Sequence, residues 1–260
     1  MTSFASLLAA VGSGGLVGFT LGLIGGGGSI LATPLLLYVV GVANPHVAIG
    51  TGALAVSVNA YANFIAHARQ KHVWWRCAII FAAMGTIGAL LGSTLGLIVD
   101  GKRLLFLFGL VMVVVGLLML RPRRVAEGPP REIDWRVCTM TGAIAVLTGA
   151  ASGFFGIGGG FLIVPALILA TGMPMINAIG SSLLAVGTFG LATAVNYARS
   201  GLVDWTLAVE FIAGGTVGGI AGMLLATRLA PRKATLNRIF AVLVLAVAAY
   251  VIVRNAPHLG

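Results

Sequence analysis

The chain has 260 residues, of which 59% are hydrophobic and 8% charged, whereas about a quarter of the residues of a soluble globular protein are charged. This composition excludes a soluble enzyme or binding domain and predicts an all-α polytopic membrane protein. A net charge of +10 would suggest a nucleic-acid partner in a soluble chain. Here the basic residues cluster in short connections between apolar runs, which is typical of membrane topology, and we expect no nucleic acid. Cys77 and Cys138 each begin an apolar run behind a basic stretch, and we interpret both as reduced thiols on the cytoplasmic side.

The apolar runs, taken in chain order, have lengths that suit a lipid bilayer. Residues 4–42 are too long for one span of about 20 residues, so the sequence predicts two arms, 4–23 and 29–41, that meet at a glycine cluster. Further spans are predicted at 47–67, 76–99 and 104–120. The first half is therefore expected to hold a glycine-broken hairpin followed by three spanning helices.

The second half of the chain repeats the plan of the first. The segment GLIGGGGSILATP at 22–34 returns as GFFGIGGGFLIVP at 153–165. The tripeptide AIG at 48–50 likewise returns at 178–180. Between the halves, the arginine- and proline-rich stretch 121–136 is interpreted as a cytoplasmic linker. We expect a first transmembrane repeat at 1–120 and a second at 137–260.

The distribution of lysines and arginines favours inverted repeats. If each half has five segments, the second half is inverted, and twelve basic residues share the side of the linker while four lie opposite. The alternative, four crossings in each half and parallel repeats, gives a split of ten against six. Because cytoplasmic connections carry the excess of basic residues, the five-plus-five arrangement is favoured, with the linker in the cytoplasm.

The paired glycine clusters are the candidate substrate site. Glycine interrupts a helix, and broken helix at membrane depth is tolerated only where it packs in protein or lines a cavity. Two breaks in matching positions of two halves indicate a transporter's binding site. A helix that begins at such a break presents N–H donors and a partial positive charge, so it can bind an anion without a buried lysine or arginine. The alternative is that the glycines only permit close helix packing.

Hydroxyl residues just after the AIG tripeptides complete the candidate site. The residues expected to bind substrate are Gly25, Gly26, Gly27, Gly28, Ser29, Thr51, Gly156, Gly158, Gly159, Gly160, Ser181 and Ser182. Three asparagines inside spans, Asn59, Asn63 and Asn196, suit either helix-to-helix hydrogen bonds or substrate contact. Glu210 is the one acid inside a span, and it is either the carrier of a coupling proton or an interfacial carboxylate that reaches water.

The doubled Gly–Pro segments, each followed by an AIG-led span, resemble the TauE/SafE family of sulfite and organosulfonate exporters over essentially the whole chain. The resemblance implies a multi-pass permease of the bacterial inner membrane that exports small sulfur-containing anions such as sulfite, sulfoacetate or thiosulfate. A secondary transporter is the function expected, with an anion channel built from re-entrant glycine loops as the alternative. The sequence carries no HExxH, Walker or nucleophile–base pattern, so we expect neither an enzyme nor a bound cofactor or metal. The partners expected are the anion, the lipid bilayer and a coupling proton or other ion.

Overall fold

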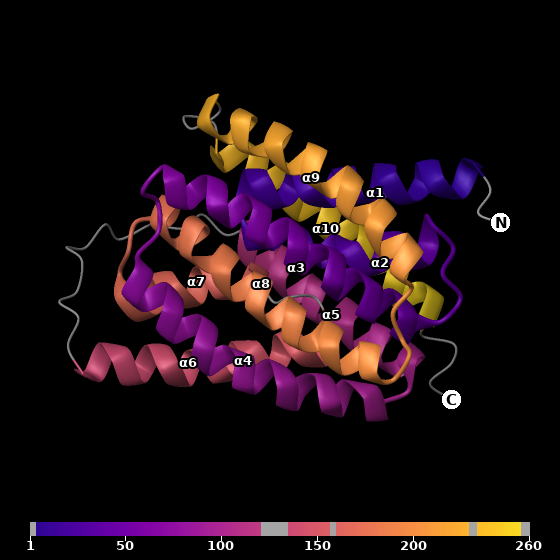
Figure 1. Ribbon diagram of the computed structural model, residues 1–260, viewed down its shortest axis with the longest axis horizontal. Coiled ribbons are helices and arrows are strands. Elements are labelled where there is room, and N and C mark those ends of the chain that lie inside the picture. The colour runs from indigo at the N-terminus through magenta and orange to yellow at the C-terminus, as the bar shows by residue number, and fades with distance from the viewer. Residues whose placement is uncertain (1–3, 121–134, 157–159, 229–232, 256–260) are drawn as a thin grey trace.

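The computed structural model of the protein describes residues 4–120, 135–156, 160–228 and 233–255. These residues form helices and connecting turns, without a strand (Figure 1). The elements are α1 (Phe4–Ile24), the 3₁₀ helix η1 (Gly26–Leu31), α2 (Ala32–Tyr38), α3 (Pro45–Arg69), α4 (Trp75–Ile98), α5 (Gly101–Leu120), α6 (Trp135–Phe155), α7 (Gly160–Thr171), α8 (Met175–Arg199), α9 (Trp205–Arg228) and α10 (Lys233–Asn255). Of the stretch 121–136 that we interpret as a linker, residues 121–134 lie outside the described residues.

The expected all-helical membrane architecture is confirmed. Within the described residues, six helices are long and apolar enough to cross a bilayer: α1, α3, α4, α5, α8 and α9. Large apolar side chains are exposed on the outside of the bundle, among them Leu91 at 62% and Val217 at 72%. A soluble protein would bury such side chains, whereas lipid solvates them. Trp75 and Trp205, each the first residue of its helix, are exposed where an aromatic side chain can anchor in the membrane interface.

Helices of the two halves pack against each other through glycine. Along α1, the residues Gly14, Gly18 and Gly22 lie against the α9 backbone at Phe211, Gly215 and Gly219. The residue numbers of the contacting pairs increase together along α1 and α9, so the two helices run in the same direction. The α4–α6 pair is built in the same way, with Gly88 and Gly92 against the backbone of Val146 and Ala150. Because a side chain at these positions would collide with backbone, the small-residue faces bring helices of different halves into close contact.

Helices α3 and α8 cross the middle of the bundle in opposite directions. Ser57 donates a hydrogen bond of 2.7 Å to the carbonyl of Gly187 near the midpoint of the pair. Gly50, near the start of α3, lies beside Leu202, which follows the end of α8. Conversely, Gly180, near the start of α8, lies beside His72, which follows the end of α3. The start of each helix therefore contacts the loop that follows the other.

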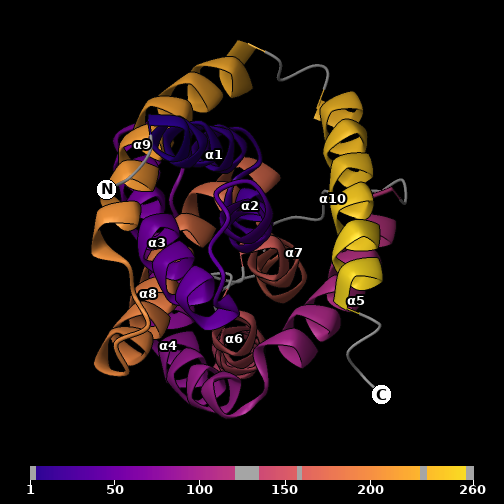
Figure 2. The ribbon, with the colours of Figure 1, turned by 90° about the vertical axis from the view of Figure 1, so that its right-hand side faces the viewer.

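The short helices α2 and α7 occupy the interior of the bundle. Figure 2 shows both of them enclosed by the longer helices, with α5 and α10 along one side. Helix α7 contacts α6, α8 and η1, while α2 contacts α3. Gly25 and Gly156, the residues that follow α1 and α6, are both buried within the protein.

Candidate functional site

The first helix break falls at Gly25, between α1 and η1. Gly25 has φ +78°, a left-handed conformation that glycine adopts without steric cost. Its N–H still donates to the Leu21 carbonyl at 2.9 Å, so the chain leaves the α-helix directly after this bond. The following residues, 26–31, continue as a fully buried 3₁₀ helix rather than as an irregular tip before an arm at 29.

The second break falls at Gly156, which also has positive φ, at +66°. Its N–H donates to the Gly153 carbonyl at 3.2 Å, and helix α7 begins at Gly160. The predicted site residues Gly158 and Gly159 lie outside the described residues. Gly25 and Gly156 are equivalent positions of the sequence repeat, so both halves leave the helix at the same point with the same backbone handedness.

Each break is packed against the AIG tripeptide of the opposite half. A Cβ atom added at Gly25 would lie 2.8 Å from Cγ2 of Ile179, and one added at Gly156 would collide with Ile49. The glycine of each tripeptide allows the loop from the other half to approach, as described above for Gly50 and Gly180. The repeated AIG sequence therefore has a physical function in the fold: its isoleucine covers the opposite break. The repeat of the tripeptide was visible in the sequence, but its contact with the breaks was not.

Around the first break, polar groups are held by the local backbone. Ser29 is fully buried, and its hydroxyl donates to the Gly26 carbonyl at 2.8 Å. A Cβ at Gly28 would collide with the backbone of Leu21 and the hydroxyl of Thr20. Gly26, Gly27 and Gly28 are buried as well, so the glycine cluster is packed closely against the end of α1.

Two buried hydroxyls beside the breaks have no hydrogen-bond partner among the described residues. Thr33 is 1% exposed and follows η1 by two positions, and Ser152 is 1% exposed and lies one helical turn before Gly156. A buried hydroxyl without a partner costs free energy, so such a group indicates a place for a ligand or a water molecule. Neither residue was predicted to bind substrate, although both stand close to the glycine clusters in the chain.

Thr51 and Ser181, two of the predicted ligands, hold helix ends of the opposite half. The Thr51 hydroxyl accepts from the N–H of Asp204 at 2.9 Å, immediately before α9. The Ser181 hydroxyl accepts from the N–H of Trp74 at 3.0 Å, immediately before α4. Ser182 donates to the Ile179 carbonyl of its own helix. The two cross-half bonds occupy equivalent positions of the repeat.

The three asparagines lie at contacts between helices. Asn196 on α8 donates to the hydroxyls of Ser93 and Thr94 on α4, at 2.9 and 3.1 Å. Asn59 on α3 accepts from Thr216 on α9 at 3.3 Å. Asn63 donates to the Asn59 carbonyl, and its amide faces Gly219 of α9. Interhelical hydrogen bonding is thus realised for Asn59 and Asn196.

Glu210 lies in the second turn of α9 and is half-buried. Neighbouring positions 207, 208 and 211 are buried, while 209 is exposed, so the carboxylate stands at the edge of the packed face. The structure does not bring it to either glycine break.

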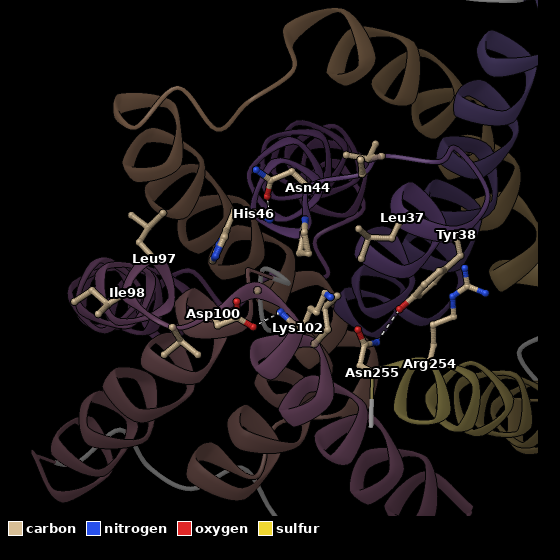
Figure 3. A pocket seen from close by; sticks show the side chains of 16 residues that line it. Leu37, Tyr38, Asn44, His46, Leu97, Ile98, Asp100, Lys102, Arg254 and Asn255 are labelled. Atoms are coloured by element: carbon tan, nitrogen blue, oxygen red, sulfur yellow. Dashed lines mark hydrogen bonds between the residues drawn. The ribbon is translucent and has the colours of Figure 1, made fainter. Parts of the chain in front are cut away.

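A cavity of about 740 Å³ opens at one end of the bundle, which we call the cavity end. It lies where the end of α2, the start of α3, the α4–α5 turn and the end of α10 meet (Figure 3). Its polar lining includes Tyr38, His46, Asp100, Lys102, Arg254 and Asn255. This site was not predicted from the sequence, because its residues are far apart in the chain; basic residues near span ends were the only signal.

Comparison with known proteins identifies the family. A family described as sulfite exporter TauE/SafE matches residues 10–251. Similar proteins include a probable membrane transporter protein of Xylella fastidiosa strain 9a5c, 68% identical over 96% of each chain. The probable membrane transporter protein YunE of Bacillus subtilis strain 168 is 29% identical over 80% of this chain and 84% of YunE. No solved structure matches the chain.

The helical bundle and these similarities together define a multi-pass membrane protein of the transporter class. The chain belongs to the TauE/SafE family, as its doubled glycine segments indicated. The names of the family and of the similar proteins describe transporters rather than enzymes.

Proposed function

We propose that the protein is a secondary transporter that exports a small sulfur-containing anion, such as sulfite, thiosulfate, sulfoacetate or a related organosulfonate, across the bacterial inner membrane. The observation that carries this proposal is the pair of buried helix breaks at Gly25 and Gly156, each covered by an isoleucine of the opposite half. A break that both halves build in the same way, in the interior of a transporter, is the feature expected of a substrate site.

The chemistry of the breaks suits an oxyanion. The first N–H groups of a helix have no partner within that helix, and the helix dipole adds a partial positive charge there. Glycine leaves room for an oxygen atom to approach these N–H groups. The hydroxyls of Thr33 and Ser152 would supply further hydrogen bonds beside the first and the second break. Binding through N–H and O–H groups avoids placing a lysine or arginine in the bilayer, which would cost several kcal/mol.

The site glycines and hydroxyls have different parts in this proposal. In this proposal the anion binds to the site residues of the two glycine clusters, and movement of Ile49 or Ile179 away from a break exposes the site to one side of the membrane. These residues are Gly25, Gly26, Gly27, Gly28, Ser29, Gly156, Gly158, Gly159 and Gly160. Thr51 and Ser181 act through the helix ends that they hold, with Ser182 beside them. In this proposal, movement of one half relative to the other changes the access of the anion to the site.

We further propose that the two repeats, 1–120 and 137–260, are inverted and contain five segments each. The opposite directions of α3 and α8 support inversion, because these helices are equivalent in the repeat and would run the same way in parallel repeats. The charge distribution then puts the cavity end outside and the linker in the cytoplasm. Inverted repeats are the usual basis of alternating access.

The test is transport by the purified protein in liposomes. We expect radiolabelled sulfite or thiosulfate flux that saturates with concentration, and counterflow of label against a gradient of unlabelled anion. Saturation with counterflow supports a carrier. Flux that rises linearly without counterflow would instead favour the anion channel. If none of the sulfur anions crosses the membrane, the proposed substrate class is wrong.

A further inference from the structure

The cavity at the cavity end carries a positively charged lining that the proposed central site does not use. Lys102 stands in the first turn of α5, and Arg254 stands in the last turn of α10. Both side chains are exposed at the opening, and Figure 3 shows them on elements that border the same hollow. A concave surface lined by charges of one sign concentrates the electrostatic field and raises the local concentration of counter-ions.

Among the described residues that line the cavity, Asp100 is the one carboxylate, and it is already engaged. Oδ1 of Asp100 accepts from the backbone N–H groups of Lys102 and Arg103, at 3.0 and 3.2 Å. This is the N-cap arrangement, in which the carboxylate balances the positive end of α5. Among the described residues no ion pair joins Asp100 to Lys102 or Arg254, so both cationic side chains can bind an external anion.

Neutral hydrogen-bond donors complete the lining. The Asn255 amide donates to the hydroxyl oxygen of Tyr38 at 2.9 Å and to the Val251 carbonyl at 2.7 Å. Because the Tyr38 oxygen accepts this bond, its own proton can point to a ligand. Nδ1 of His46 is buried without a partner in the described part of the chain. Two cations, a phenol and an imidazole thus surround a space of about 740 Å³, ample for a small hydrated oxyanion.

We propose that this cavity is a second anion site, which binds a sulfonate or inorganic oxyanion from solution through Lys102 and Arg254, with Tyr38 as hydrogen-bond donor. Its role as a vestibule for the transported anion rests on the proposed function, whereas the binding itself does not. The cavity borders the last turn of α2, whose other end leads back to the Gly25 break. An anion held here is at the opening of the bundle, outside the central site.

The test measures the electrostatic preference of the cavity by cysteine reactivity. Ala43 lines the cavity and is exposed, so Ala43→Cys places a thiol inside it. The detergent-solubilised variant is reacted with an anionic sulfonatoethyl methanethiosulfonate and with its trimethylammonium analogue. The rate measured for the chain without Ala43→Cys gives the background reaction of Cys77 and Cys138. We expect Lys102→Gln combined with Arg254→Gln to lower the rate with the sulfonate reagent about fivefold at low ionic strength and to raise the rate with the cationic reagent.

Arg103→Gln is the matched control. Arg103 is the exposed neighbour of Lys102 but does not line the cavity, so its removal should change the two rates much less. Sulfate at constant ionic strength should slow the sulfonate reagent in a saturable manner in the Ala43→Cys chain and not in the doubly substituted one. An equal effect of Arg103→Gln, or protection by sulfate no greater than that by chloride, would overturn the proposal. Because the assay measures no transport, its result does not depend on whether the sulfite flux experiment succeeds.

Discussion

Thr51 is a residue whose hydroxyl has two possible functions, and they make different predictions. The structure gives it the N–H of Asp204 as a donor, so Thr51→Val should leave that N–H without its partner and cost about 1 kcal/mol of stability. Thr51→Ser keeps the oxygen and should melt near the wild-type temperature. The measurement is the thermal melting point in detergent. If Thr51→Val melts like the wild type yet loses sulfite transport, the hydroxyl is a substrate ligand instead.

A second prediction about a single residue concerns Glu210 and proton coupling. If it carries a coupling proton, Glu210→Gln should abolish transport driven by a pH gradient while exchange of internal for external anion continues. Exchange needs only the loaded carrier to reorient, whereas net coupled flux needs the carboxylate to bind and release a proton. The glutamine keeps the size of the side chain and its hydrogen-bonding capacity. Wild-type rates in both assays would identify Glu210 as an interfacial carboxylate without a coupling role.

At the scale of elements, the packing of α1 on α9 can be tested with two glycines of one helix. A Cβ at Gly18 would collide with the Gly215 backbone, so Gly18→Ala should force α1 and α9 apart and cost about 1–3 kcal/mol. Gly12 lies in the same helix, and no atom of the described residues comes within 4 Å of its Cβ position. Gly12→Ala should therefore leave stability unchanged or raise it slightly, since alanine favours helix. Equal melting temperatures of the two variants would contradict the close contact.

The positions of the helices could be predicted from the sequence, whereas their partners could not. The predicted spans 47–67 and 76–99 correspond to α3 and α4 within a few residues, because apolar runs of bilayer length end at polar or basic residues. The break was expected in the glycine cluster and falls at Gly25. That α1 packs on α9 of the other half depends on contacts between residues almost 200 positions apart, which periodicity in one helix does not reveal.

The candidate site was predictable only in part for the same reason. The helix breaks at the glycine clusters could be predicted, because the backbone flexibility of glycine is a property of the residue itself. The covering isoleucines, Ile49 and Ile179, and the cavity between α2, α3, α5 and α10 arise from tertiary packing. A hydroxyl such as that of Ser181 can bind substrate or a helix end, and the choice depends on which N–H group the fold brings near it.

At the scale of the whole molecule, the proposed inverted arrangement predicts the side of the membrane on which each loop lies. Ala43, Ser200 and Gln70 are exposed loop or helix-end residues suitable for single cysteines. We expect Ala43→Cys and Ser200→Cys to react with an impermeant maleimide applied to intact cells, and Gln70→Cys to react only after the membrane is opened. Four parallel crossings in each half would instead put Ser200 on the same side as Gln70, so labelling of Ser200→Cys separates the two topologies.

The central claim is that the anion binds at the paired helix breaks, and sulfite counterflow in liposomes tests it most directly. Gly25 and Gly41 both have positive φ, at +78° and +86°, but only a Cβ at Gly25 would meet the opposite half. Gly41→Ala therefore controls for a side chain placed at a positive-φ glycine, whereas Gly25→Ala also brings a Cβ against Ile179 of the opposite half. The wild type and Gly41→Ala should accumulate labelled sulfite against unlabelled sulfite, and Gly25→Ala, checked for folding by its melting curve, should not. Counterflow by folded Gly25→Ala at the wild-type rate would contradict a substrate site at the breaks.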